Sequence, residues 1–369
     1  METQPETGQG IGRNTLKNLV RNKKYNTHMH QNRVSNRNQN QNQHFSHNEI
    51  GKYVFNCQWV GNLHARRILS ERYGLYGDVI SVFDTTLNVK TNNDDLLVVT
   101  ISKVRSPINM NVLPIFKEKE RGGGIQGFRG IIDFGTEVKI QKNEMSIGNV
   151  IFRLGKCRVF QSTLDRLPSA NHLSEFMNKS DEIFKILKTY SRKGCLLSPD
   201  LTTKGLLSKF LKNVHSYRCG YSNAFTATAN AIMSQALLDL CGKGPGYTPS
   251  GDDFVAGYLG VFNWISKSLN FNTMNFPSEK FAPLTSWMSS KLIDYSKRNL
   301  CDEEIQAMIN SIAAGDLNQY ISSIVKISRR GHTSGIDIVT GMTIALYTVI
   351  DDTFETNLIG RFCSSLDPD

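Results

Sequence analysis

The sequence predicts an α+β protein, with a β-rich N-terminal barrel or sandwich domain followed by an all-α C-terminal domain. Short runs of β-branched and aromatic residues, separated by Gly and Asn turns, fill residues 53–165. From about residue 168, apolar residues recur at helical spacing. A chain of 369 residues that is 39% hydrophobic can bury a sizeable core. We expect a tail at 1–50, a β-rich domain at 51–167 and a helical domain at 168–369.

The first fifty residues differ in composition from the rest. The run Gln31–Asn48 is almost wholly Asn, Gln, Arg, His and Ser, and such a segment buries too little apolar area to offset its ordering entropy. Seven Lys or Arg and three Glu give the tail a charge of +4 within a total of +10. We expect a disordered, basic, Asn/Gln-rich tail. A net charge of this kind suits an anionic small molecule as well as nucleic acid.

Six strands and one helix are expected in the β-rich domain, because β-branched and aromatic residues cluster between turn residues. The strands are Tyr53–Val60, Asp78–Phe83, Leu96–Ser102, Thr136–Ile140, Asn149–Arg153 and Cys157–Gln161, and the helix is Leu63–Tyr73. Short strands at such intervals are typical of a barrel or a sandwich.

Eight helices are expected in the second domain, because each segment places apolar residues at i, i+3 and i+4. They are His172–Tyr190, Thr203–His215, Asn223–Leu240, Gly251–Leu269, Leu284–Arg298, Asp302–Ala313, Leu317–Ile327 and Ser334–Ile350.

Cysteine spacing and hydropathy indicate the cellular environment. The seven cysteines are odd in number, scattered and free of C-x-x-C pairs, so we expect reduced, mostly buried thiols rather than disulfides or zinc ligands. The most apolar stretches, near 254–265 and 338–350, are shorter than the roughly 20 residues of a membrane helix. No secretory hydrophobic region opens the chain. We therefore expect a cytoplasmic protein without membrane contact.

Two motifs in the helical domain carry the functional signal. The first motif, Gly242–Asp253, reads GKGPGYTPSGDD, and the second motif, Gly331–Asp337, reads GHTSGID. Each leads into a helical apolar stripe, and residues 250–257 and 334–341 share the pattern Ser-Gly-x-Asp-apolar-Val-x-Gly. The glycines and prolines of the first motif impose an unusual backbone path. We interpret the two motifs as related helix starts.

The shared pattern also predicts how the two helices meet. Gly257 and Gly341 each follow an aspartate by four residues and lie on its helical face. Because glycine lacks Cβ, two helices can approach closely there. We expect the helices to cross at these glycines and to bring Asp253, Asp337 and both N-termini together. Free N–H groups and helix dipoles would then favour an anion.

The predicted anion or phosphate site combines main-chain and polar groups of both motifs. Its members are Lys243, Gly244, Gly246, Thr248, Ser250, Gly251, Thr333, Ser334 and Gly335. His332, together with Arg329 or Arg330, would add the full charge that a phosphate prefers. The chain has no G-x-x-x-x-G-K-[ST] match, so this is not a Walker loop.

Two alternatives use the same residues differently. Ser-x-x-Asp at a helix start often acts only as a cap worth about 1 kcal/mol, which would make Ser250 and Ser334 purely structural. In the other alternative, Asp252, Asp253 and Asp337 are oxygen ligands for magnesium, which would in turn hold a phosphate. Magnesium is the one cofactor that the residues suggest.

Both motifs resemble the signatures of the third subunit of oxamate carbamoyltransferase, a family also described as a domain of unknown function. Its members carry G-K-G-P-G-L-T-P-S-x-D-D and, later, G-H-T-S-G-x-D. This chain matches from Gly242 through Asp253, with Tyr247 where Leu is usual, and from Gly331 through Asp337. The resemblance implies a part in carbamoyl transfer between carbamoyl phosphate and oxamate, which yields oxalurate and phosphate in allantoin and purine breakdown.

The resemblance also implies partners and catalytic roles. The family enzyme requires three different polypeptides, so we expect two other subunits and an anionic small substrate. The candidate catalytic residues are His332, Asp253 and Asp337. His332 suits general acid or base catalysis because its unperturbed pKa lies near neutrality; the alternative is a histidine that bonds a neighbouring carbonyl. Two other functions stay open: a non-catalytic assembly or regulatory subunit, and nucleic-acid binding through the basic tail.

Overall fold

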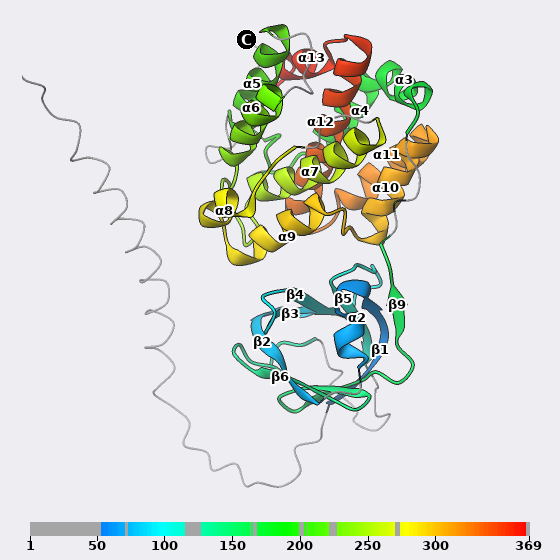
Figure 1. The fold of residues 1–369 in the computed structure, drawn as a ribbon, viewed down its shortest axis with the longest axis vertical. Helices are drawn as coiled ribbons and strands as arrows, with labels where there is room; N and C mark the ends of the chain where they lie inside the picture. The colour runs from blue at the N-terminus through cyan, green and yellow to red at the C-terminus, as the bar shows by residue number, and fades with distance from the viewer. Residues whose placement is uncertain are drawn as a thin grey trace, which may run out of the picture. The chain divides into compact units, whose positions relative to one another are not determined.

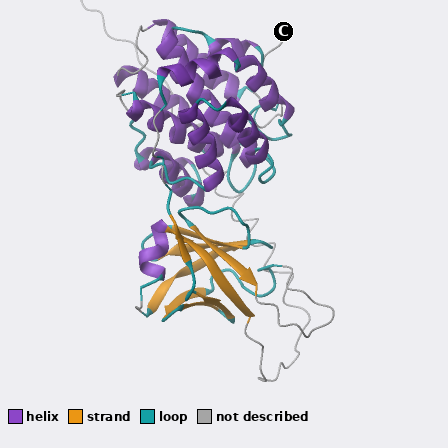
Figure 2. Cartoon of the chain, turned by 90° about the vertical axis from the view of Figure 1, so that its right-hand side faces the viewer, coloured by secondary structure: helices purple, strands orange, loops and turns teal. Residues whose placement is uncertain are grey.

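The chain separates into two units, Met1–Gly51 and Lys52–Asp369. The computed structural model describes residues 53–70, 73–114, 127–162, 164, 168–198, 203, 205–220, 227–269 and 274–366. The predicted tail at 1–50 lies outside these residues. Everything below concerns the second unit. Its strands gather in one part with one short helix beside them, and its other helices gather in another part (Figure 2).

The described strands form a closed eight-stranded barrel with a ninth strand added (Figure 1). The strands are β1 (Tyr53–Gly61), β2 (Gly74–Val82), β3 (Thr86–Thr91), β4 (Leu96–Thr100), β5 (Asn109–Pro114), β6 (Glu137–Gln141), β7 (Glu144–Ile147), β8 (Val150–Arg153) and β9 (Arg158–Phe160). Their order is β5-β4-β3-β2-β6-β7-β8-β1, and pairing of β5 with β1 closes the ring. Strand β9 pairs with β1 further along the same edge that pairs with β8. The prediction of a β-rich first half is confirmed, and the structure is a barrel rather than a sandwich.

Alternation of side chains explains why these segments form a barrel. In β6, Val138 and Ile140 are buried while Glu137, Lys139 and Gln141 are exposed, which is the two-residue period of a strand with one face on a core. The barrel interior contains packed phenylalanine rings, and every pair has its ring centroids between 5.3 and 6.4 Å apart. This core is separate from that of the helices.

The structure contains three strands that the sequence did not predict, β3, β5 and β7. Their sequences include Asn, Lys, Ser and Glu, which weakens the β-branched and aromatic signal. Helix α2 spans Asn62–Ile68, so it ends earlier than the predicted Leu63–Tyr73. Strand β2 already begins at Gly74, so a helix that continued to Tyr73 would leave no residues for the turn between them.

One pair of cysteines contradicts the prediction of reduced thiols. Cys57 and Cys157 form a disulfide across a sequence separation of 100 residues. Cys57 belongs to β1, whose edge pairs with both β8 and β9, and Cys157 lies between those two strands. Linear spacing cannot reveal a pairing that depends on barrel closure. Four other cysteines are free and buried, as predicted: Cys195, Cys241, Cys301 and Cys363.

The second half of the chain is helical in its described part, as predicted (Figure 1). Its helices are α3 (Ala170–Asn178), α4 (Ser180–Thr189), α5 (Leu206–Gly220), α6 (Ala227–Leu238), α7 (Ser250–Ser268), α8 (Ser278–Phe281), the 3-10 turn η1 (Ala282–Leu284), α9 (Trp287–Lys297), α10 (Glu303–Ala314), α11 (Leu317–Ile327), α12 (Ser334–Phe354) and α13 (Leu358–Ser364). The predicted helix His172–Tyr190 is two helices, α3 and α4, which meet at Lys179. Helices α8 and α13 were not predicted.

Helix α12 is longer than the apolar stretch that the sequence indicated. The helix has 21 residues and is long and apolar enough to cross a membrane. Its mean hydropathy is 1.2 over the most apolar 18 residues, but 89% of those 18 residues are buried inside the protein. The core helix of a soluble protein meets the same criteria of length and composition, so α12 is weak evidence for a membrane span. The prediction that the stretch near 338–350 is too short to span a membrane is therefore wrong, because the helix that contains it has 21 residues.

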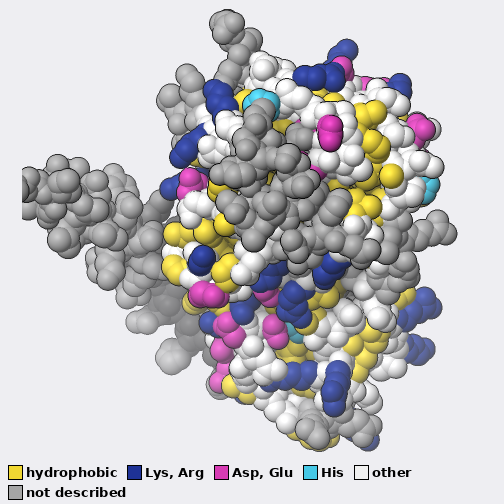
Figure 3. All heavy atoms as spheres, turned by 45° about the horizontal axis from the view of Figure 1, so that its top comes forward, with side chains coloured by type: hydrophobic (Ala, Val, Ile, Leu, Met, Phe, Trp, Pro, Cys, Tyr) yellow, Lys and Arg dark blue, Asp and Glu magenta, His cyan; other side chains and the backbone are white. Residues whose placement is uncertain are grey.

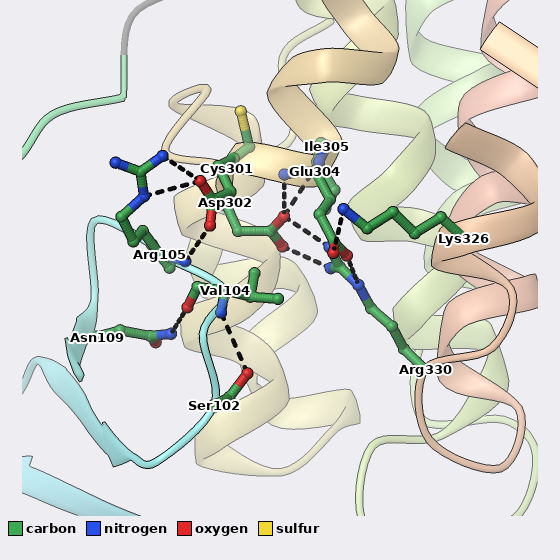
Figure 4. Close-up of polar contacts among 12 residues, drawn as sticks. Ser102, Val104, Arg105, Asn109, Cys301, Asp302, Glu304, Ile305, Lys326 and Arg330 are labelled. Carbon is green, nitrogen blue, oxygen red and sulfur yellow. Dashed lines mark hydrogen bonds and ion pairs between the residues drawn. The ribbon is translucent and has the colours of Figure 1, made fainter. Parts of the chain in front are cut away.

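Contacts join the barrel to the helices at α9 and α10. The Arg105 guanidinium, between β4 and β5, forms an ion pair with Glu303 at the start of α10 (Figure 4). The Leu96 N–H of β4 donates to the Tyr295 hydroxyl of α9 at 2.9 Å. Lys and Arg side chains spread over the face drawn in Figure 3 rather than forming one patch, which agrees with a diffuse net charge.

Candidate active site at two helix starts

Helices α7 and α12 cross at the two predicted glycines. A Cβ added to Gly257 would lie 2.1 Å from the carbonyl oxygen of Ile338, and one added to Gly341 would lie 2.1 Å from that of Phe254. Each glycine therefore touches the backbone of the opposite helix, and the predicted crossing is confirmed. Both helices are buried along most of their length.

The crossing brings the acidic residues of the two motifs together. Asp253 is 6% exposed and Asp337 is fully buried. The Thr248 hydroxyl donates to Asp253 Oδ2 at 3.2 Å and lies 3.1 Å from the Ser334 hydroxyl. The Thr248 hydroxyl of the first motif therefore contacts both Asp253 and the Ser334 hydroxyl of the second motif.

Burial controls the protonation of this pair. Desolvation raises the pKa of Asp253 well above its usual range, and the neighbouring Asp337 charge raises it further, while hydrogen bonds from Ser334 and Thr248 oppose the shift. Desolvation raises the pKa of Asp337 to about 7. Asp337 Oδ2 accepts no hydrogen bond from a described residue, although the Ser250 and Thr333 hydroxyls favour its charged form. Two buried carboxylates whose charges repel do not both ionise readily, so we expect at least one of them to be protonated near neutral pH.

A third segment, residues 191–198, connects the two motifs. The Ser250 hydroxyl of the first motif donates to the Gly194 carbonyl at 2.9 Å. The Leu196 N–H donates to Asp337 Oδ1 of the second motif at 2.8 Å. A Cβ on Gly194, whose φ is +91°, would lie 3.1 Å from the Pro245 ring. We call residues 191–198 the clasp.

Arg192 of the clasp adds a positive charge that sequence reasoning missed. Its Nη1 donates to the carbonyls of Gly331 and His332 at 3.2 and 3.1 Å, so the guanidinium is fixed beside the second motif. The signal in the sequence is short: the run Arg-Lys-Gly at 192–194 places two cations next to a glycine. Nothing in that run indicates which motif it contacts.

The cap-only alternative is not what the structure shows. The N-cap residues are Pro249 for α7 and Thr333 for α12, and neither makes a side-chain cap hydrogen bond. Ser250 lies inside the helix and donates to the clasp instead. Ser334 likewise lies in the first turn and contacts Thr248. Both serines therefore link different parts of the site.

Two of the predicted main-chain anion donors are already used. The Gly251 N–H donates to the Lys243 carbonyl at 2.8 Å, and the Gly335 N–H donates to the Arg330 carbonyl at 3.2 Å. Both glycines are also buried. The tight turns before the helices thus satisfy these groups, and neither is free to bind an anion as predicted.

The remaining predicted groups form the outer part of the site. Lys243, Gly246 and His332 are exposed, whereas Gly244 and Ser334 are half-buried. The His332 imidazole has no hydrogen-bond partner in the described part of the chain, so the alternative of a histidine bonded to a loop carbonyl is not observed. Its side chain is accessible to a ligand or to a partner chain.

Asp252 has a structural role apart from the other two aspartates. Its Oδ1 accepts from the Gly242 N–H at 2.7 Å, and its Oδ2 accepts from the Thr285 hydroxyl. No group of three or more His, Cys, Asp or Glu side chains among the described residues is arranged to hold a metal ion. The three aspartates proposed for magnesium therefore do not form a common ligand set.

Arg330 is not available to a ligand, contrary to one suggestion from the sequence. Its guanidinium forms ion pairs with Asp302, at 2.7 Å, and with Glu304 (Figure 4). Lys326 reaches Glu304 as well, at 3.0 Å. Arg329, by contrast, is exposed. Among the described residues, Arg329 and the unused donors of Arg192 are thus available to a ligand near the second motif.

Both motifs and the crossing of their helices lie within one stretch of recognisable sequence. Residues 240–346 match the family model described as oxamate carbamoyltransferase subunit AllH. The matched stretch is less than a third of the chain, and over it the resemblance predicted from the motifs is confirmed. Searches of the curated proteins and of the solved structures gave no match. The barrel and the clasp lie outside the matched residues.

Proposed function

We propose that this chain is a subunit of a multi-chain oxamate carbamoyltransferase and that the two motifs bind carbamoyl phosphate. One observation carries the proposal: both motifs lie in the stretch that matches the AllH family model, and their hydroxyls meet next to Asp253, which the Asp337 charge also affects. The two other subunits implied by the resemblance would complete the enzyme, and oxamate would be the second substrate.

The outer part of the site suits the leaving group. In the reaction, the oxamate nitrogen attacks the carbonyl carbon of carbamoyl phosphate, the bond from that carbon to the phosphate oxygen breaks, and a proton leaves the nitrogen. Lys243, Arg192 and the Gly246 N–H would neutralise the departing phosphate, because fixed donors and cations stabilise developing charge. The exposed, unbonded His332 imidazole would accept the proton.

The buried part of the site would orient the other end of the substrate. Thr248 and Ser334 donate to Asp253 when it is charged, which leaves their oxygen lone pairs free to accept N–H groups of the carbamoyl moiety. Asp337 is fully buried, so it would act through Asp253 and the clasp as a positioning residue. A change at Asp253 would then alter both binding and turnover.

The test is turnover in the reconstituted complex of this chain with its partner subunits. We expect His332→Asn to lower kcat by about a hundredfold or more, and Asp253→Asn/Asp337→Asn to abolish stabilisation of the chain by carbamoyl phosphate. A ligand at a hundred times its Kd adds about 2.7 kcal/mol to unfolding, which thermal unfolding detects easily. Lys280→Gln, an exposed change on α8 outside both motifs, is the control. If His332→Asn and the double aspartate variant both kept wild-type turnover, the catalytic residues would lie on the partner subunits.

A second candidate is an accessory subunit whose motifs form a rigid scaffold for assembly. The observation in its favour is that Asp337 is fully buried and that the Gly251 and Gly335 N–H groups are bonded within the chain. In that case the site variants would weaken co-purification with the partner subunits while the assembled complex kept its turnover. Nucleic-acid binding through residues 1–50 concerns residues outside the described part and stays a prediction.

A further inference from the structure

A cavity of about 640 Å³ lies on the barrel, where α2 packs beside the start of β2. Its volume is in the range of small-molecule sites. The basic residues of its lining are Arg66 and Arg67 of α2, with His64 behind them, and its aromatic residues are Tyr73 and Tyr76. None of these residues belongs to either motif, so the cavity is separate from the proposed carbamoyl phosphate site.

A buried hydrogen-bond chain fixes the wall of this cavity. His64 is 3% exposed, and burial lowers its pKa, so the imidazole is neutral. Its Nε2 lies 2.8 Å from the Leu96 carbonyl, and its Nδ1 lies 2.8 Å from the Tyr76 hydroxyl. A neutral imidazole can satisfy both contacts if Nε2–H donates to the carbonyl and Nδ1 accepts from Tyr76. The Tyr76 ring is therefore held in place without a ligand.

The fixed ring in turn orients a cation. The Arg67 guanidinium lies over the Tyr76 ring, 4.6 Å from its centroid, and such stacking leaves the edge N–H donors of arginine free. Neither Arg66 nor Arg67 forms an ion pair with any residue that the structure describes. The single described carboxylate in the lining, Asp95, accepts a hydrogen bond from Tyr295 at 3.3 Å. Within the described part of the chain, these two arginine charges thus have no carboxylate partner.

The rim of the cavity is apolar and exposed. Tyr73 is 71% exposed and Leu75 is 45% exposed, although large hydrophobic side chains are usually covered. We infer that the cavity binds a small organic anion, with a carboxylate or phosphate held by Arg66 and Arg67 and an apolar or aromatic body against Tyr73 and Leu75. This site would exist in addition to the one formed by the two motifs.

The test uses calorimetric titration of the full chain with phenyl phosphate, benzoate and inorganic phosphate. We expect at least one aromatic anion to bind saturably, and Arg66→Gln/Arg67→Gln to weaken it by about tenfold or more. Tyr73→Ala should weaken the aromatic anions and leave inorganic phosphate unaffected. The preferred aromatic probe distinguishes a phosphate ligand from a carboxylate ligand. Arg129→Gln is the control, because Arg129 is an exposed barrel arginine that pairs with Asp84.

Three outcomes would overturn the inference: no saturable binding of either aromatic anion, binding that survives loss of both arginines, or binding that disappears in Asp253→Asn/Asp337→Asn. The last would show that the probe occupies the two-motif site. If the double arginine variant does not fold, the exposed single change Arg66→Gln should still weaken binding about threefold. Failure of carbamoyl phosphate binding at the motifs would not affect these results.

Discussion

Asp337 is an acidic residue in an environment where acidic side chains rarely occur without a partner. It is fully buried, one carboxylate oxygen accepts the Leu196 N–H, and the other has no donor among the described residues. Desolvation therefore keeps the carboxyl protonated up to a pH of about 7, its raised pKa. An asparagine would fit this position at lower electrostatic cost, because an amide carries no charge to desolvate.

The raised pKa of Asp337 predicts a specific dependence of stability on pH. The unfolded chain releases this proton near pH 4 and the folded chain near pH 7, so the stabilisation is complete below pH 4 and is lost as pH rises towards 7. Asp337→Asn removes this contribution, because an amide does not titrate. We expect urea unfolding at pH 5 and pH 8 to show a smaller loss of stability in the variant than in the wild type.

The matched control is Asp316→Asn, at the exposed N-cap of α11. We expect this variant to show the same loss of stability between pH 5 and pH 8 as the wild type. If Asp337→Asn kept the pH dependence of the wild type, the carboxyl would already be ionised in the folded protein at pH 5, and the raised pKa of Asp337 would be wrong.

At the scale of elements, the crossing of α7 and α12 determines the geometry of the site. The sequence predicted this crossing because an eight-residue pattern recurs with a glycine at its end, and a glycine two turns into a helix has few other uses. The clasp could not be predicted in the same way. Gly194 and Leu196 contact residues 56 and 141 positions away, and no local pattern encodes such contacts.

Substitution of the crossing glycines tests this arrangement. Gly257→Ala would place a Cβ 2.1 Å from the Ile338 carbonyl, so the helices must separate, at a cost of about 1–3 kcal/mol or more. In the same helix, a Cβ on Gly260 would meet nothing nearer than 3.7 Å. Gly260→Ala should therefore be neutral or stabilise by up to about 1 kcal/mol, because alanine favours helix.

Chemical unfolding of the two variants gives the comparison directly. Equal stability of Gly257→Ala and Gly260→Ala would show that the backbones do not touch in solution. The aspartates would then lack the close approach on which the candidate site depends.

At the scale of the whole molecule, the barrel and the helices share a small core. Leu96 and Ile108 of the barrel region cluster with Met288 and Tyr295 of α9. The sequence distinguished the two regions because the apolar period changes from two to 3.6 between them. It gave no indication of this shared core, nor of the Cys57–Cys157 disulfide, since both depend on tertiary contacts between distant residues.

The shared core predicts that both regions unfold together. Tyr295→Phe removes the hydroxyl that accepts the Leu96 N–H at 2.9 Å, and an unpaired buried N–H costs about 1–3 kcal/mol. We expect one calorimetric transition in the wild type and a lower Tm in the variant, for barrel and helices alike. Tyr247→Phe, at a tyrosine that is 54% exposed, should leave Tm unchanged. Two separate transitions in the wild type would contradict the coupling.

The position of β1 in the barrel affects how the chain emerges from the ribosome. On one side β1 pairs with β8 and β9, which are made about a hundred residues later. At about 5–20 residues per second, the ribosome needs roughly 5–20 s to supply them. During that interval the strand bearing Phe55 and Val60 has an open edge, to which another nascent chain can pair. Within the described part of the chain, β1 therefore waits longer for its partner strands than neighbouring helices of the second half, which can pack as they appear.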